Sequence, residues 1–209
     1  MYKKIATSLA LAVAASIPAF ATVVTPGAVV VPSVSTAAGF TAVSPTITGT
    51  IAPGTFSATY QTTVFKDTNN VFCSGCLDFV YFVSNQGPGV IERVTGFSFD
   101  SFQTSVSYIV NGAGIAPVSA NRTANGNTLG FAFSTAGITT GQFSDFLVIQ
   151  TNATNYSSGL FSIQDGSAGT GTAYMPVSAS AVPEPSSLVL LGTGLFGAAA
   201  GLRRKLFQA

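Results

Sequence analysis

The sequence predicts an all-β protein, an antiparallel β-sandwich or jelly-roll ectodomain, with a cleavable signal helix before it and a short transmembrane helix after it. Three observations support this prediction. Apolar and polar residues alternate with a period of two through the middle of the chain. Turn signals rich in Gly, Asn and Pro separate these runs, and no convincing 3.6-residue apolar stripe occurs there. Uncharged apolar runs occupy both ends of the chain.

The first 21 residues are typical of a secretory signal peptide. Lys3 and Lys4 give a positively charged start, residues 5–17 are apolar, and Ala19 and Ala21 form a small-x-small cleavage site. The alternative is a buried N-terminal helix of the fold. We therefore expect export through the secretory translocon, removal of this segment by signal peptidase, and no part for it in the folded domain.

Residues 22–54 form a leader rich in Pro, Thr and Val, which we expect to be extended with at most one edge strand, because proline weakens strand pairing. A β ectodomain is expected over residues 55–165, reaching to about 175. Residues 166–182 have the Gly/Ser/Ala composition of a linker. The strands expected in the ectodomain cover residues 56–64, 77–83, 90–99, 105–110, 129–134, 142–151 and 159–164. Asn111-Gly112 and Asn125-Gly126 predict type I′ turns.

Charge and composition exclude several classes of function. Charged residues make up 7% of the chain, and its formal net charge is +1. Residues 22–182 contain three basic and six acidic residues, so their net charge of −3 disfavours nucleic acid as a partner. The chain contains no histidine, which excludes Ser-His-Asp catalysis and histidine metal sites. Few charges protect the sheet edges, so either the leader covers them or the protein associates edge to edge.

The C-terminal segment, residues 183–209, has three parts in a fixed order. The tripeptide Pro183-Glu184-Pro185 comes first, an uncharged apolar run covers residues 188–202, and a basic tail follows at residues 203–205. A helix of these 15 residues spans roughly 22 Å, less than a bilayer core of about 30 Å. It is therefore a marginal membrane span, suited to a transient anchor. The basic tail is expected to stay in the cytoplasm.

This arrangement, with Pro183-Glu184-Pro185 at its start and Arg203-Arg204 at its end, resembles the PEP-CTERM sorting signal of Gram-negative bacteria. The resemblance implies export, a transient stay in the inner membrane, and recognition of the Pro-Glu-Pro motif by exosortase, an integral-membrane cysteine enzyme that removes the tail. It also implies a setting at the cell surface or in the exopolysaccharide matrix of a biofilm. The alternative is an ordinary tail anchor with a proline hinge.

Cys73 and Cys76 are the two cysteines of the chain. In an exported protein we expect them to form a disulfide, and Gly75 gives the backbone the freedom to close so small a ring. A thioredoxin-like redox centre is the alternative, but it requires a helix after the first cysteine, and the residues from Leu77 onward are typical of a strand. A metal site needs further ligands that the neighbouring sequence lacks, and no cofactor is expected.

Three functions from different classes remain open. The first is a non-enzymatic exported protein, processed by exosortase and placed at the cell surface or in the matrix. The second is a carbohydrate-binding module in which Tyr60, Tyr108 or Tyr156 stacks on sugar rings. The third is a carboxylate-dependent glycan hydrolase, in which burial raises the pKa of Asp78 and a second carboxylate lies nearby.

Overall fold

The structure, a computed structural model, describes residues 21–178, which form fourteen β-strands and no α-helix. The strands are β1 (Thr22–Val23), β2 (Val29–Val30), β3 (Ser33–Val34), β4 (Phe40–Ala42), β5 (Ile47–Ile51), β6 (Ala58–Asp67), β7 (Cys76–Asn85), β8 (Arg93–Gly96), β9 (Thr104–Ile109), β10 (Ser119–Arg122), β11 (Leu129–Ala132), β12 (Phe146–Thr151), β13 (Asn155–Asp165) and β14 (Ser167–Val177). Within residues 21–178, no helix is long and apolar enough to cross a membrane.

Several predicted features lie outside the described residues. They are the signal peptide up to Phe20, including Ala19, the sorting tripeptide Pro183-Glu184-Pro185, the apolar run 188–202, and the basic tail with Arg203 and Arg204. The signal-peptide and membrane-helix predictions therefore stay predictions.

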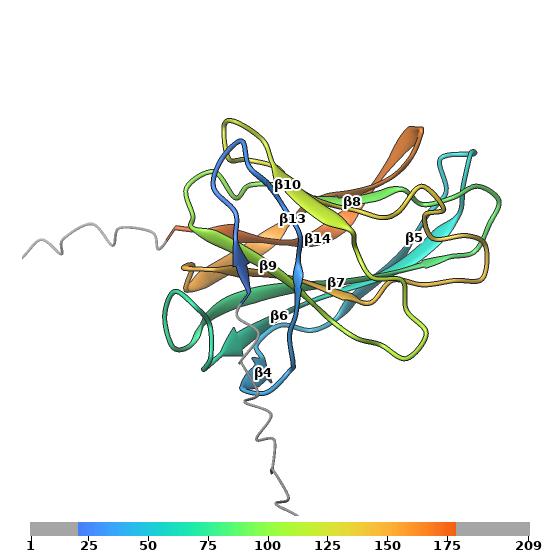
Figure 1. Cartoon of the computed structure of the whole chain (residues 1–209). Helices are drawn as coiled ribbons and strands as arrows, with labels where there is room; N and C mark the ends of the chain where they lie inside the picture. The colour runs from blue at the N-terminus through green and yellow to red at the C-terminus, as the bar shows by residue number, and fades with distance from the viewer. Residues whose placement is uncertain (1–20, 179–209) are drawn as a thin grey trace, which may run out of the picture. The chain divides into compact units, whose positions relative to one another are not determined.

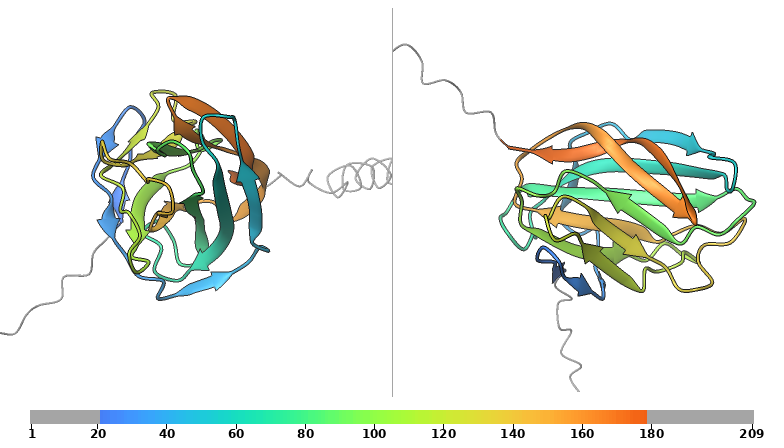
Figure 2. Two further views of the ribbon diagram at one scale, coloured as in Figure 1. Left: turned by 90° about the vertical axis from the view of Figure 1, so that its right-hand side faces the viewer. Right: turned by 90° about the horizontal axis from the view of Figure 1, so that it is seen from above.

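The strands form two sheets (Figure 1). The eight-stranded sheet has the order β1-β9-β12-β7-β6-β4, with β3 also paired to β9 and β5 also paired to β6. The six-stranded sheet has the order β14-β13-β8-β11-β10-β2. All strand pairs are antiparallel except β3 with β9, so the prediction of an all-β, antiparallel fold is confirmed. Figure 2 shows the two sheets packed face to face around a common core.

Aromatic side chains join the two sheets across the core. Phe161 of β13 packs against Tyr60 of β6, with ring centroids 4.6 Å apart, and against Tyr81 of β7 at 5.9 Å. Phe79 of β7 meets Phe99, which follows β8, edge to face at 5.9 Å. Each of these rings is buried, because the period of two turns alternate residues of β6 and β7 toward the opposite sheet. The apolar residues that alternate along the sequence of β6 and β7 are therefore the residues that form the core.

The leader differs from the expected single edge strand, because it contributes five short strands, β1 to β5. Its prolines do not prevent this, since they lie between strands: Pro26, Pro32 and Pro45 separate successive leader strands, and Pro53 follows β5. The leader strands pair with β9, with β6 and with β10, which are the outermost strands from the rest of the domain at three of the four sheet edges. The leader therefore covers these three edges, which was one of the two alternatives for how the sheet edges are protected.

The linker expected over residues 166–182 is corrected by the structure. Residues 167–177 form strand β14, which pairs with β13 along its whole length. Small residues are present because the core comes close to the strand: a Cβ at Gly171 would lie 2.9 Å from atoms of Ile51, Tyr60 and Phe161. The Gly/Ser/Ala composition of this segment, which is typical of a linker, is therefore a result of close packing against the core.

The two predicted type I′ turns are also corrected. Gly112 and Gly126 have positive φ, but among the described residues Ser98 is the one non-glycine residue with positive φ, so neither Asn111 nor Asn125 adopts the required conformation. Asn125-Gly126 lies in the hairpin between β10 and β11, as a turn signal should. Asn111-Gly112 lies in the longer connection from β9 in one sheet to β10 in the other.

Candidate functional site

A five-residue segment of the leader, residues 35–39, crosses the outer face of the eight-stranded sheet; we call it the strap. Its crossing follows from the pairing, because β3 lies on β9, β4 lies on β6, and β12 and β7 lie between them (Figure 1). Ser35 bonds the hydroxyl of Ser107 at 2.9 Å, and the carbonyl of Ala38 accepts a hydrogen bond from the Asn69 amide at 2.8 Å. The strap is therefore fixed to the sheet at both ends.

Two buried carboxyl groups lie side by side at the end of β6 and the start of β7. Asp67 and Asp78 are 2% and 0% exposed. The side-chain amide nitrogen of Gln150, on β12, donates to both carboxyl groups, at 3.1 Å to Asp67 and 3.2 Å to Asp78. The Asn70 amide donates to Asp78 at 2.7 Å. Gly39 of the strap abuts Asp67, since a Cβ there would lie 2.9 Å from its Oδ1. We call Asp67 and Asp78 the carboxyl pair.

Burial raises the pKa of Asp78 to about 8. The charge of Asp67 raises it further, whereas the hydrogen bonds from Gln150 and Asn70 favour the ionised form and oppose the shift. At neutral pH Asp78 is therefore mostly protonated. The structure thus supplies the second carboxyl group that the hydrolase hypothesis required. However, both groups are closed off from solvent, and a sugar ring has no access to them.

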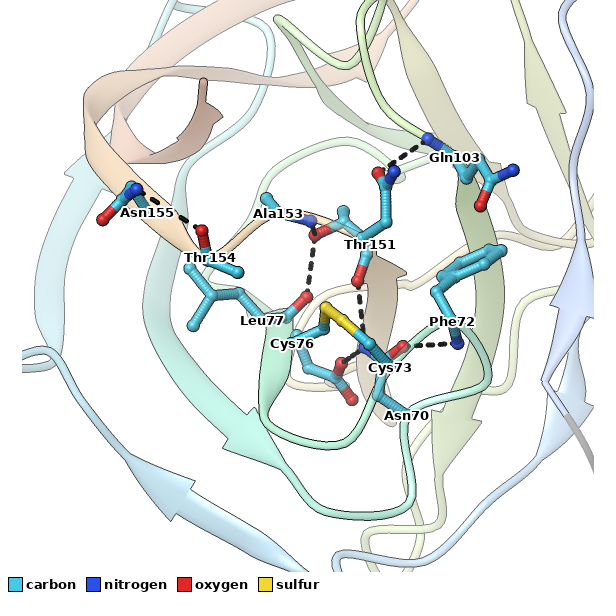
Figure 3. The surroundings of a disulfide bond; sticks show 12 residues. Asn70, Phe72, Cys73, Cys76, Leu77, Gln103, Thr151, Ala153, Thr154 and Asn155 are labelled. Carbon is cyan, nitrogen blue, oxygen red and sulfur yellow. Dashed lines mark hydrogen bonds between the residues drawn. A yellow bond between two sulfur atoms is a disulfide. The ribbon is translucent and has the colours of Figure 1, made fainter. Parts of the chain in front are cut away.

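The disulfide expected from the sequence is present in the structure. Cys73, in the loop after β6, is bonded through its sulfur to Cys76, the first residue of β7, and their Cα atoms are 5.4 Å apart (Figure 3). Gly75 has a φ of 80°, the left-handed conformation that glycine adopts readily. Strand β7 begins at Cys76, so no helix follows the pair. Within residues 21–178, no three His, Cys, Asp or Glu side chains gather as a group that could bind a metal.

An aromatic groove lies on the outer face of the eight-stranded sheet. Its volume is about 440 Å³. Its apolar lining consists of Ala37, Phe40, Phe65, Val80, Phe82, Ile109 and Phe146, and its polar lining consists of Gln61 and Thr63. A second hollow of about 270 Å³, lined largely by threonines of β5 and β6, shares Gln61 and Phe82 with it. The two hollows are therefore adjacent, and neither lining contains a charged side chain.

The tyrosines predicted to stack on sugars do not form a common surface. Tyr60 is buried in the core, which removes it as a stacking platform. Tyr156 is half-buried, donates its hydroxyl to the carbonyl of Val43 at 2.6 Å, and packs edge to face against Tyr174. Tyr108 pairs with β3 at the sheet edge. Half-buried phenylalanines line the groove instead. Phe65 and Phe82 alternate with the core residues of β6 and β7, and this period of two is the sequence signal that identifies them.

A comparison with protein families found one match: residues 181–205 match the model of the PEP-CTERM protein-sorting motif. The matched stretch includes Pro183-Glu184-Pro185 and Arg203-Arg204, so the resemblance is confirmed at the residues that support it. The chain therefore carries a PEP-CTERM sorting motif near its C-terminus. This motif implies export to the envelope or cell surface, with exosortase as the processing partner. The comparisons with curated proteins and with solved structures found no match.

Proposed function

We propose that this chain is a non-enzymatic protein of the cell surface or of the exopolysaccharide matrix. It is exported with loss of its signal peptide, held briefly in the inner membrane by residues 188–202, and processed by exosortase at Pro183-Glu184-Pro185. The sorting motif at residues 181–205 is the observation on which the proposal rests. Two prolines keep this short stretch extended and free of internal hydrogen bonds, which suits a peptide bound in an enzyme cleft.

The carboxyl pair supports the non-enzymatic part of the proposal. Asp67 and Asp78 share the amide of Gln150, and Asp67 also lies against Gly39 of the strap, so the two carboxyl groups contribute to the packing of the sheet face. Acid catalysis requires a carboxyl group within hydrogen-bond reach of the substrate oxygen, and the near-complete burial of both groups prevents that contact.

Replacing Pro183-Glu184-Pro185 by three alanines should block processing, because the extended, acidic recognition element is lost. Intact mass and membrane fractionation of the exported protein check this result: the variant should keep residues 186–209 and remain in the inner membrane. Replacing Ser178 and Ser180 by alanine is the matched control, since it alters the neighbouring residues and keeps the motif. Unchanged processing and location of the triple-alanine variant would refute the proposal.

The aromatic groove favours a second candidate function, a carbohydrate-binding module of the envelope. Sugars present C–H faces to aromatic rings and hydroxyl groups to amides and hydroxyls, and the groove provides Phe82 and Phe146 beside Gln61 and Thr63. The absence of charge in its lining selects neutral glycans over acidic ones.

Under this second function, Phe82→Ala should weaken retention on neutral glycans about tenfold, because the ring shared by the two hollows is removed. Affinity electrophoresis in gels that contain the glycan measures the change. Leu160→Ala is the control, since Leu160 is 57% exposed on the other sheet and should leave retention unaltered. If no neutral glycan retards the parent protein, this candidate is rejected, and the sorting proposal is unaffected.

A further inference from the structure

We infer that one end of the ectodomain forms a docking surface for exosortase. This exit end consists of three loops, residues 68–75 between β6 and β7, 97–103 between β8 and β9, and 152–154 between β12 and β13. The inference rests on the proposed function and adds a second contact to the sorting motif, made by the folded domain itself.

The exit end is the end at which the chain leaves the six-stranded sheet. Val177, the last residue of β14, pairs with Asn155 at the start of β13. The carbonyl of Ala153 accepts a hydrogen bond from the Leu77 amide at 3.0 Å, and the Asn152 side chain accepts one from the Gln103 amide at 3.0 Å. Figure 3 shows these segments grouped beside the disulfide. The three loops therefore lie at the same end of the domain as the point of exit.

Little chain separates this end from the motif. Residues 178–182 alone lie between β14 and Pro183. At about 3.3–3.6 Å per residue, that stretch spans at most roughly 20 Å when fully extended. An enzyme that holds the Pro-Glu-Pro tripeptide in a cleft therefore has Val177, the last residue of β14, within roughly 20 Å of that cleft, unless β14 first unpairs from β13. Its eleven-residue pairing with β13 opposes such unpairing.

The surface at this end has the chemistry of an interface. Val23 and Val71 are 54% and 37% exposed. A hollow of about 440 Å³ beside them combines the apolar Val23, Phe72 and Phe102 with polar side chains and the charged Asp100 and Arg122. Apolar groups held on ordered loops gain more from contact with a partner than apolar groups on mobile loops, because less entropy is lost. Two of these loops are tied down: the disulfide closes the loop at residues 68–75, and Arg122 binds the carbonyls of Phe99 and Phe102 in the loop at residues 97–103.

The test uses the full chain in cells that contain exosortase, with the rate of conversion to the mature mass as readout. The double variant Val71→Glu and Phe102→Glu should be converted at least tenfold more slowly, because charges enter an apolar contact. Val118→Glu is the matched control and should be converted at the parental rate. Val118 is 50% exposed and lies at the opposite end of the sandwich, where its amide bonds the carbonyl of Ala132.

A second variant distinguishes a loss of docking from a loss of folding. Val71→Glu alone replaces a side chain that is already exposed, so it should keep the disulfide and the protease resistance of the parent while still slowing conversion several-fold. Conversion of this variant and of the double variant at the parental rate would overturn the docking inference. In that case the triple-alanine motif variant distinguishes the two claims: if it stays unprocessed, the proposed function stands without the docking surface.

Discussion

Replacing Arg122 by leucine should lower the free energy of unfolding by about 3–5 kcal/mol. The Arg122 side chain is 4% exposed, and its guanidinium binds backbone carbonyls. The acceptors are the carbonyls of Gly126, Val24, Phe99 and Phe102, at distances of 2.5 to 3.2 Å. Leucine fills a similar volume and donates no hydrogen bond, so these carbonyls lose a partner in a buried site. Chemical denaturation of the purified protein measures the loss.

The reason for so large an effect is that one buried side chain binds four backbone carbonyls from three separate segments. It lies at the end of β10, and its partners belong to the leader, to the β10–β11 hairpin and to the loop after β8. Burial lowers the pKa of the guanidinium, and the charge of Asp100 opposes that shift. A lysine in its place provides a single charged group without the planar fork, so Arg122→Lys should recover only part of the stability.

Arg93 offers a matched comparison for this prediction. It is half-buried, and it donates to the side chains of Thr95 and Asn121 instead of to backbone carbonyls. Those polar side chains can turn toward solvent when Arg93 is replaced, whereas carbonyls fixed in the backbone cannot. Arg93→Leu should therefore cost less, about 1–2 kcal/mol. Equal losses for the two variants would contradict the role assigned to Arg122.

The sequence predicted the parts of the fold that depend on local pattern. The alternation of β6 and the nearly continuous apolar run of β7 located two central strands, because the period of two reflects which side chains face the core. It did not predict β14, where close contact with Ile51 and Phe161 selects small residues that otherwise indicate a linker. Nor did it predict the short leader strands, since a pair of two-residue strands depends on the partner strand and not on its own composition.

The site was predictable only in part for the same reason. Asp78 was identifiable because an acid inside an apolar strand must be buried, whereas its neighbours Asp67 and Gln150 come from other strands. Their proximity is set by register: Gln150 pairs with Asp78 across β12 and β7, and Asp67 pairs with Cys76 across β6 and β7. The strap that covers them depends on a crossing between two sheet edges, which no local pattern specifies.

The carboxyl pair should make the stability of the domain fall as pH rises. The pKa of Asp78 is raised from 3.8 to about 8, so between these values the folded protein holds a proton that the unfolded chain has released. The free energy of unfolding then decreases by about 1.4 kcal/mol per pH unit across that window. The stabilisation is fully present below about pH 4 and is lost as pH passes about 8. Asp67 is the titratable group that faces Asp78, and the strap contains none.

Asp78→Asn should remove most of this slope, because an amide holds no titrating proton and adds no charge beside Asp67. At pH 8 the variant should be more stable than the parent by several kcal/mol, and the advantage should shrink steadily toward pH 4. Denaturation curves at pH 5, 6.5 and 8 measure the difference, and the absence of histidine from the chain keeps this window free of its titration. Asp100→Asn, which changes an exposed aspartate, is the control and should keep the parental slope. Parallel curves for the parent and Asp78→Asn would show that the proton is not held at Asp78.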